Sequence, residues 1–261
     1  MRHPLVTATL ATTMHRMSGG RFALGLGRGE AVVGHDGPAG SHPYLSQDPA
    51  FREDIPIMLV AMGERTLEFA GRVADGVVLH TFFTDRTLAR AVSSIRRGAA
   101  AAGRDPASVR VWSVLATVGD HLDEEARLRK LVGRLATYLQ GYGDLLVRVN
   151  EWDPADLARF RADDLVDGYP GAFDALATPD ELRHLAGLLP EHWLEAAATG
   201  SPERCARRVL AQFDAGADSV VLHGATPAEL APIIDAYRAV RPADRFEGLP
   251  RNPGRARAGQ P

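Results

Sequence analysis

Short apolar segments alternate with helical stretches along most of this chain, and this alternation restricts the fold more than any other feature. Five segments have the length and composition of buried strands, at residues 21–26, 55–62, 74–80, 109–118 and 217–223. Helical periodicity marks the stretches around them, at residues 4–17, 64–73, 85–102, 201–214 and 227–240. Because strands joined through helices pair in parallel, the pattern predicts an α/β fold with a parallel sheet covered by helices.

The first strand runs into a glycine-rich loop that ends at a carboxylate. Its sequence is Gly25-Leu-Gly-Arg-Gly-Glu30, so that glycine recurs at Gly27 and Gly29. Glycines permit positive φ and let a flat ligand approach the backbone closely. Loops at the carboxyl ends of strands build the active face of parallel α/β proteins. This loop is therefore the first candidate binding element.

Residues 120–200 differ from the rest of the chain because they contain several helical patterns and no convincing strand. A segment of this length is far longer than an ordinary connection, and long insertions at a strand end often form a substrate lid. Packing alone is an equally good explanation. The sequence predicts a break in the first long helix of this segment, at Gly141-Tyr142-Gly143.

Two strands share one local sequence. Residues 74–80 read Ala-Asp-Gly-Val-Val-Leu-His, and residues 217–223 read Ala-Asp-Ser-Val-Val-Leu-His. Two βα units built alike favour a repeated barrel over an open sheet, and in a barrel His80 and His223 both lie at the catalytic rim. Either histidine can have a functional role there or make only a structural hydrogen bond.

Composition narrows the classes of function. The chain has 261 residues, a formal net charge of -3 and one cysteine, Cys205. These values give no electrostatic basis for binding nucleic acid or an anionic membrane, and no intrachain disulfide can form. With no signal-peptide pattern and no membrane-spanning apolar run, we expect a cytoplasmic protein. His35 and His42 lack further ligand-type neighbours, so we predict loop residues and no metal site.

The motifs Arg2-His-Pro4, Ser18-Gly-Gly-Arg-Phe-Ala-Leu-Gly-Leu-Gly-Arg-Gly-Glu30 and Ala70-Gly-Arg-Val-Ala-Asp-Gly76 together resemble the luciferase-like monooxygenase superfamily. The closer similarity is to its branch of oxidoreductases that use the deazaflavin coenzyme F420. The resemblance implies a (β/α)8 TIM barrel with the flavin at the carboxyl ends of the strands. It also implies hydride transfer at the deazaflavin C5, or oxygen insertion where the cofactor is FMN.

The chain also departs from the family pattern. In the family the helix equivalent to residues 4–17 follows the third strand, so we expect an incomplete barrel with five recognisable strands and a helical insertion before the last one. The family helix that follows the loop at Glu30 is replaced here by residues 33–54, which are rich in glycine and proline. We expect residues 1–246 to form one oxidoreductase domain, and residues 247–261 to form a disordered tail.

The resemblance assigns roles residue by residue. Glu30 matches a carboxylate that faces the deazaflavin and acts as a proton donor, and it is the candidate catalytic residue. The candidate cofactor-binding residues lie at strand ends or in the helix after the second strand: Gly27, Gly29, Gly63, Arg65, His80 and Thr81. Tyr138 and Tyr142, beside the predicted helix break, lie where the family encloses the substrate.

Three functions remain open at this point. The first is an F420-dependent oxidoreductase that acts on a small organic substrate, and the second is an FMN-dependent monooxygenase of the same fold. The third is a non-catalytic remnant or a subunit completed by another chain, because the family residues on the first three strands have no counterpart. An open barrel exposes strand edges, so a homodimer is expected.

Overall fold

The computed structural model describes residues 4–19, 21–26 and 56–247. The chain divides into two compact units. The first contains Met1–Val78, Ser94–Arg110 and Phe246–Pro261, and the second contains Leu79–Ser93 and Val111–Arg245. The predicted loop at residues 33–54 lies outside the described residues, as does nearly all of the predicted tail. Among the described helices, none is both long and apolar enough to cross a lipid bilayer.

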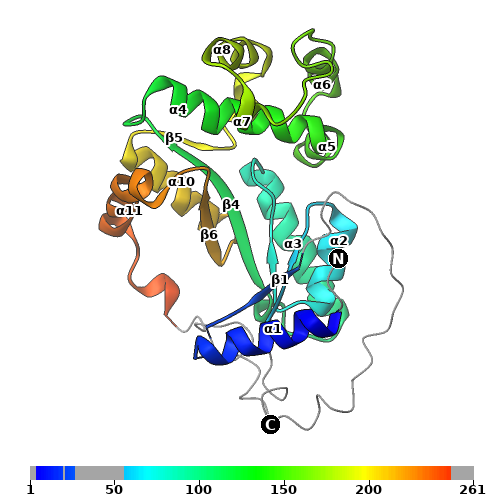
Figure 1. Ribbon diagram of the computed structural model, residues 1–261. Helices are drawn as coiled ribbons and strands as arrows, with labels where there is room; N and C mark the ends of the chain where they lie inside the picture. Colours follow the sequence, from blue (N-terminus) through cyan, green and yellow to red (C-terminus); the bar gives the residue numbers. More distant parts are fainter. Residues whose placement is uncertain (1–3, 20, 27–55, 248–261) are drawn as a thin grey trace. The chain divides into compact units, whose positions relative to one another are not determined.

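The first unit contains three parallel strands in the order β1-β2-β3 (Figure 1). These strands are β1 (Leu24–Leu26), β2 (Ile57–Val60) and β3 (Gly76–Val78), and the unit's helices are α1 (Pro4–Met17), α2 (Glu64–Val73) and a 3-10 turn at Pro106–Ser108. Helix α3 (Asp85–Ala101) begins in the second unit and ends in the first. The predicted strands are confirmed in place but are shorter, because pairing stops where the backbone turns into the loops.

Close packing of α2 on the last turns of α3 depends on two glycines in the first unit. A Cβ at Gly71 would lie closer than 3.0 Å to the backbone of Ile95, and a Cβ at Gly98 would meet the backbone of Glu68 in the same way. Arg97 extends this contact with ion pairs to Glu68 at 2.9 Å and to Glu64 at 2.8 Å. Gly71, in the motif Ala70-Gly-Arg-Val-Ala-Asp-Gly76, therefore has a packing role.

Helix α1 has the predicted bounds, but its large apolar residues are not the ones that are buried. Leu10 and Met17 are 46% and 78% exposed, whereas Ala11 and His15 are buried. The His15 ring contacts the carbonyl of Phe22 through Nδ1 at 3.0 Å. Periodicity showed which residues share a face of this helix, but the packing partner decided which face is covered.

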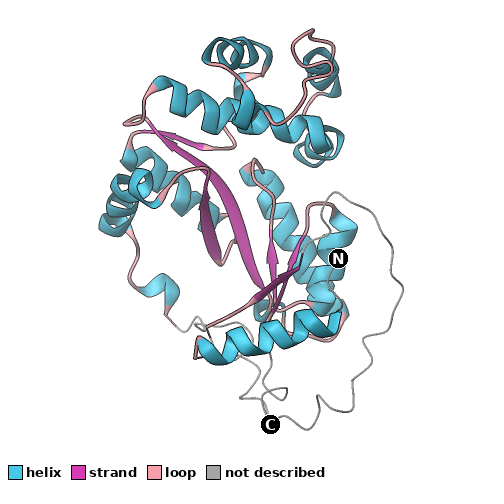
Figure 2. Cartoon of the chain, viewed as in Figure 1, coloured by secondary structure: helices cyan, strands magenta, loops and turns pink. Residues whose placement is uncertain are grey.

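The second unit contains a strand group and a helical group (Figure 2). In the strand group, β4 (Arg110–Gly119) pairs in parallel with β6 (Ser219–His223) along residues 112–116 and with β5 (Ala198–Gly200) along residues 117–119. Helices α10 (Pro202–Asp214) and α11 (Pro227–Val240) pack beside these strands, and a 3-10 turn follows at Asp244–Phe246. Strand β5 corrects the prediction that residues 120–200 contain no strand. Three residues are too few to show a strand pattern in a sequence.

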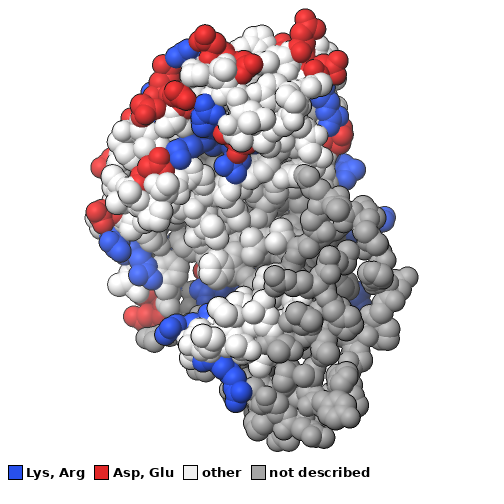
Figure 3. All heavy atoms as spheres, viewed as in Figure 1, with Lys and Arg blue, Asp and Glu red and all other residues white. Residues whose placement is uncertain are grey.

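The predicted helical insertion is confirmed and precedes the last strand. It contains α4 (Glu124–Leu128), a π-helical turn η4 (Arg129–Gly133), α5 (Arg134–Asn150), α6 (Pro154–Arg161), α7 (Phe173–Leu176), α8 (Pro179–Leu188) and α9 (Glu191–Leu194). Its core is apolar and includes the fully buried Trp193, stacked on Trp152 at 4.7 Å between ring centroids. On the face drawn in Figure 3, acidic and basic side chains stand side by side over α4, α6 and α8.

Candidate functional site

The repeated Ala-Asp sequence has a structural cause that is the same in both copies. The carboxylate of Asp75 accepts a hydrogen bond from the Ile57 amide at 2.9 Å, and that of Asp218 accepts one from the Val111 amide at 2.8 Å. In return, the two aspartate amides donate to the carbonyls of Ile57 and Val111, both at 2.9 Å. Each aspartate thus pairs its own strand with the start of a neighbouring strand. The histidine that ends each copy stands five residues after its aspartate, so the two histidines occupy equivalent positions.

The loop after β3 carries His80 and is held in a strained conformation. Phe82 is fully buried and has φ 63, a left-handed conformation that is uncommon outside glycine. The side chain of Asn150, the last residue of α5, stabilises it from two directions. Asn150 Nδ2 donates to the Phe82 carbonyl at 2.8 Å, and Oδ1 accepts from the Thr84 amide at 3.1 Å. Helix α5 therefore anchors this loop.

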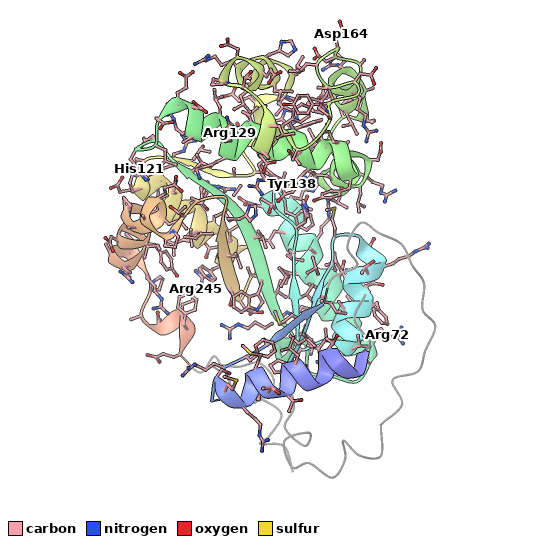
Figure 4. The ribbon with its side chains drawn as sticks, viewed as in Figure 1. Arg72, His121, Arg129, Tyr138, Asp164 and Arg245 are labelled. Carbon is pink, nitrogen blue, oxygen red and sulfur yellow. The ribbon has the colours of Figure 1, made fainter. Side chains whose placement is uncertain are left out.

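Helix α5 presents a polar and aromatic row toward this loop. Arg134, Tyr138 and Tyr142 are each four residues apart, so they lie on one face of the helix. The π-helical turn before Arg134 and the non-helical φ of -149° at Tyr142 alter the direction of the row, and such irregularities are frequent at functional sites. The predicted break at residues 141–143 is confirmed as a kink at Tyr142, where two helical segments of α5 meet. Figure 4 labels Tyr138 on this face of α5.

His80 lies against both tyrosines. Its ring centroid is 4.8 Å from that of Tyr138 and 5.0 Å from that of Tyr142, and both contacts are edge-to-face. The two tyrosine rings stack on each other at 5.6 Å with an interplanar angle of 27°. The structure therefore brings together a residue predicted for the cofactor and two predicted for the substrate, and we call His80, Tyr138 and Tyr142 the aromatic cluster.

The pKa of His80 is lowered to about 4. Burial of the ring is the largest cause, and the nearby His223 lowers the pKa further, while the hydrogen bond to the carbonyl of Thr81 acts in the opposite direction. Nδ1 of His80 lies 2.7 Å from that carbonyl oxygen. Because a carbonyl only accepts hydrogen bonds, Nδ1 carries the proton. The imidazole is neutral at physiological pH.

His223, at the end of β6, belongs to the same region of the second unit. Its pKa is lowered first by burial and then by the positive charge of Arg134, and its Nδ1 is buried without a hydrogen-bond partner among the described residues. Arg134 is itself neutralised by an ion pair with Asp174 at 2.8 Å. Asp174 also accepts a hydrogen bond from Thr137 at 2.9 Å. Arg134 therefore offers the site little free positive charge.

Some residues of this region carry no recognisable sequence signal. Lys130 had no predicted role, yet its Nζ donates to the Gly224 carbonyl at 3.2 Å and pairs with Glu229 at 3.1 Å. Lys130 thereby connects the π-helical turn to the loop after β6. In that loop Gly224 has a positive φ of 95°. The spacing of four residues between Arg134 and Tyr138 is a sequence pattern that indicates a shared helix face. No sequence pattern indicates the roles of Asn150 and Lys130, because their partners are remote in sequence.

Two cavities adjoin β5 in the second unit, with volumes of about 610 Å³ and 330 Å³. Both are lined by Thr199 and Arg204. The larger one also contains Asp85, Glu191, Glu195 and Arg208, and Asp85 pairs with Arg208 at 2.7 Å. With carboxylates in excess of arginines, this cavity does not favour an anionic ligand, and the aromatic cluster remains the better candidate site.

The first unit holds the other described candidates. Gly63 precedes α2 with φ -80 and ψ 146, and a Cβ built there would meet nothing within 4 Å. The same open space surrounds Gly25 on β1. Neither glycine is explained by packing or backbone strain, so both fit a flat cofactor that approaches the backbone. Arg65 is exposed in the first turn of α2. Gly27, Gly29 and Glu30 lie outside the described residues.

Comparisons with known proteins agree on a common ancestry. Relative to curated proteins, the chain is 27% identical over 253 residues to 5,10-methylenetetrahydromethanopterin reductase of Methanolobus tindarius, covering 84% of this chain and 73% of that protein. It is 28% identical over 143 residues to the phthiodiolone/phenolphthiodiolone dimycocerosates ketoreductase of Mycobacterium tuberculosis, covering 41% of this chain and only 38% of the ketoreductase.

Solved structures show the same fold. The coenzyme F420-dependent tetrahydromethanopterin reductase from Methanopyrus kandleri superposes with a TM-score of 0.65 at 20% identity, over 90% of this chain and 78% of that one. An F420-dependent secondary alcohol dehydrogenase, solved with an F420-acetone adduct, gives a TM-score of 0.56 at 16% identity over 93% and 77% of the two chains.

These matches support the predicted barrel fold of the luciferase-like type, which the alternation of strands and helices had indicated. The family model for luciferase-like monooxygenases matches residues 33–219, which is well over half of the chain. The chain belongs to the luciferase-like monooxygenase family.

Proposed function

We propose that this protein is an F420-dependent oxidoreductase that transfers a hydride between the deazaflavin and a small organic substrate. The observation that carries the proposal is that two solved structures, matching 90% and 93% of the chain, have titles that name a coenzyme F420-dependent reductase and an F420-dependent dehydrogenase. The relative found by sequence, which matches 84% of the chain, is also named a reductase. Open space at Gly25 and Gly63 supports it, because both backbones can admit a flat ring system.

In this proposal each group of residues has one task. Gly63, with Gly27 and Gly29 of the glycine-rich loop, approaches the ring system, and Arg65 contributes a positive charge toward the anionic side chain of the cofactor. Glu30 holds the proton that is exchanged with the substrate. When bound, the deazaflavin supplies or accepts the hydride at C5.

A direct binding measurement tests the cofactor. The purified chain is titrated separately with F420 and with FMN, and binding is followed by intrinsic tryptophan fluorescence and by equilibrium dialysis. We expect saturable micromolar binding of F420 and much weaker binding of FMN. Glu30→Gln should retain F420 binding and lose turnover, because the side chain is proposed to move a proton and not to hold the cofactor.

A glycine substitution makes the test specific to the proposed contact. Gly63→Val adds a side chain where the protein has open space, so folding should be unaffected while the Kd for F420 rises at least about tenfold. Gly187→Ala, in an exposed part of α8 with similarly open surroundings, is the matched control and should leave the Kd unchanged. An unchanged Kd for Gly63→Val would contradict this cofactor position.

An FMN-dependent monooxygenase is the second candidate, favoured by the description of the family model that matches the chain. Tighter binding of FMN than of F420 would establish it in place of the first. Failure of a folded protein to bind either cofactor would overturn both and leave a non-catalytic remnant, or a subunit completed by a partner chain.

A further inference from the structure

The ring of His80 has one nitrogen engaged and one available. Nδ1 donates to the Thr81 carbonyl at 2.7 Å, which leaves the lone pair of the neutral ring on Nε2. None of the described residues makes a hydrogen bond to Nε2, and Nε2 is not among the described polar atoms that are buried without a partner. The nitrogen is therefore accessible to a ligand.

The surroundings of His80 keep it an acceptor. Among the described residues, the groups that face it are the rings of Tyr138 and Tyr142, with His223 farther away, and none of these is a carboxylate that would stabilise the imidazolium. Burial and His223 hold the pKa of His80 near 4. The charge of Arg134, which influences His223, is already paired with Asp174.

The geometry of the cluster is fixed before any ligand arrives. The loop that carries His80 is bonded to the end of α5 through Asn150, and Thr87 Oγ1 donates to the carbonyl of Val149 at 3.1 Å. Arg90 also bonds the Val149 carbonyl and pairs with Glu151. The imidazole and the two tyrosine rings therefore belong to one rigidly connected set of elements, and such preorganisation lowers the entropic cost of binding.

We propose that Nε2 of His80 accepts a hydrogen bond from a hydroxyl or N–H group of the substrate, next to a planar apolar part that contacts Tyr138 and Tyr142. The substrate class is then an uncharged molecule with a donor group on or beside a flat ring. This inference rests on the proposed function, and it makes His80 a specificity residue and not the proton-transfer group. It also replaces the cofactor-binding role predicted for His80.

Three probes that share one benzene ring separate the possible roles of His80 in the protein without cofactor. Phenol can donate a hydrogen bond, anisole has the same ring but no donor, and benzoate is an anion. Binding is measured by NMR on the full chain with 15N-labelled histidine at pH 7. We expect phenol to bind about three- to tenfold more tightly than anisole, the effect of one net hydrogen bond, and more tightly than benzoate. The 15N resonance of His80 Nε2 should shift from its non-protonated position when phenol is added.

A matched pair of variants assigns the effect to one residue. His80→Phe keeps an aromatic ring and removes the acceptor, so phenol and anisole should bind equally. His192→Phe, at a histidine outside the aromatic cluster, should keep the preference for phenol. Should His80→Phe fail to fold, the tautomer and the three affinities of the wild-type protein still decide the question.

Three results would overturn the inference. The first is a His80 ring protonated on Nε2 at pH 7. The second is benzoate binding at least as tightly as phenol, and the third is absence of binding by all three probes. The outcome is separate from that of the cofactor titration, since F420 binding without a phenol preference removes only the role of His80. Phenol binding without F420 binding removes the oxidoreductase and leaves a binding site.

Discussion

His80 illustrates how a residue's chemistry depends on what surrounds it. In the sequence it is one of two histidines that end similar strands, and the resemblance to the family predicted that it contacts the cofactor. In the structure the ring is packed among aromatic side chains and donates to a carbonyl, which makes it neutral and an acceptor.

The lowered pKa of His80 predicts a pH dependence of stability. The pKa is about 4 in the folded protein and 6.5 for an unperturbed histidine, so between these values the unfolded chain binds a proton that the folded chain does not. The free energy of unfolding should therefore fall by on the order of 2 kcal/mol as the pH is lowered from 6.5 to 4. His80→Asn should reduce this fall in urea titrations, and His192→Asn should not. Identical pH profiles for His80→Asn and the wild type would disprove the assignment.

Asn150 is a second residue whose role is set by remote partners. Asn150→Ala leaves the carbonyl of Phe82 and the amide of Thr84 without their partners, beside a strained φ of 63. The expected loss is about 2 to 4 kcal/mol in the free energy of unfolding, measured by denaturant titration. Gln140→Ala on the same helix is the control, because the Gln140 amide makes no hydrogen bond to another described residue. A loss below about 0.5 kcal/mol would mean that Asn150 does not anchor the loop.

At the scale of elements, the family motif Ala70-Gly-Arg-Val-Ala-Asp-Gly76 serves the packing of the first unit. Gly71 allows α3 to approach α2, and Asp75 pairs β3 with the start of β2. A Cβ at Gly76 would in turn meet Met58 and the carbonyl of Arg110. Asp218, next to β6, makes the same type of hydrogen bond as Asp75 and accepts from the Val111 amide. The similarity of the two copies therefore reflects strand pairing, and it says little about cofactor chemistry.

The contact between α2 and α3 predicts that glycine-to-alanine substitutions at different positions lower the stability of the protein by different amounts. Gly71→Ala and Gly98→Ala each place a methyl group against backbone, which cannot move aside without separating α2 from α3, so each should cost roughly 1 to 3 kcal/mol. Gly187→Ala has open space on α8 and should be neutral or stabilising by up to about 1 kcal/mol. Thermal unfolding measures all three. Equal effects at the three positions would show that the close approach is absent in solution.

At the scale of the whole molecule, Cys205 reports on the second unit because the chain has no other cysteine. It is fully buried on α10, and burial raises the pKa of its thiol to about 11. Labelling by a thiol reagent at pH 8 should therefore proceed only through opening of the structure, at a rate that rises steeply with denaturant. Labelling of the native protein at the rate of an unfolded control would contradict the burial of α10 against β5.

The sequence alone determined most elements, their order and the family. The predicted helices at residues 201–214 and 227–240 are confirmed. Their starts can be read from the sequence because the caps, Ser201 and Thr226, bond residues within three positions of themselves. The alternation that predicted a luciferase-like barrel is equally local, since a short apolar run and a helical period are complete within one element. The family motifs that supported the resemblance are also contiguous in the chain.

Only the tertiary structure decided which surfaces and side chains meet. It exposed Leu10 on α1 and added β5 through its pairing with β4. It also placed His80 between two tyrosines of α5 and closed the loop with Asn150. Burial, tautomer and pKa depend on contacts between segments that are far apart in sequence. No local pattern contains that information, because the energy of such a contact exists only after both segments have packed.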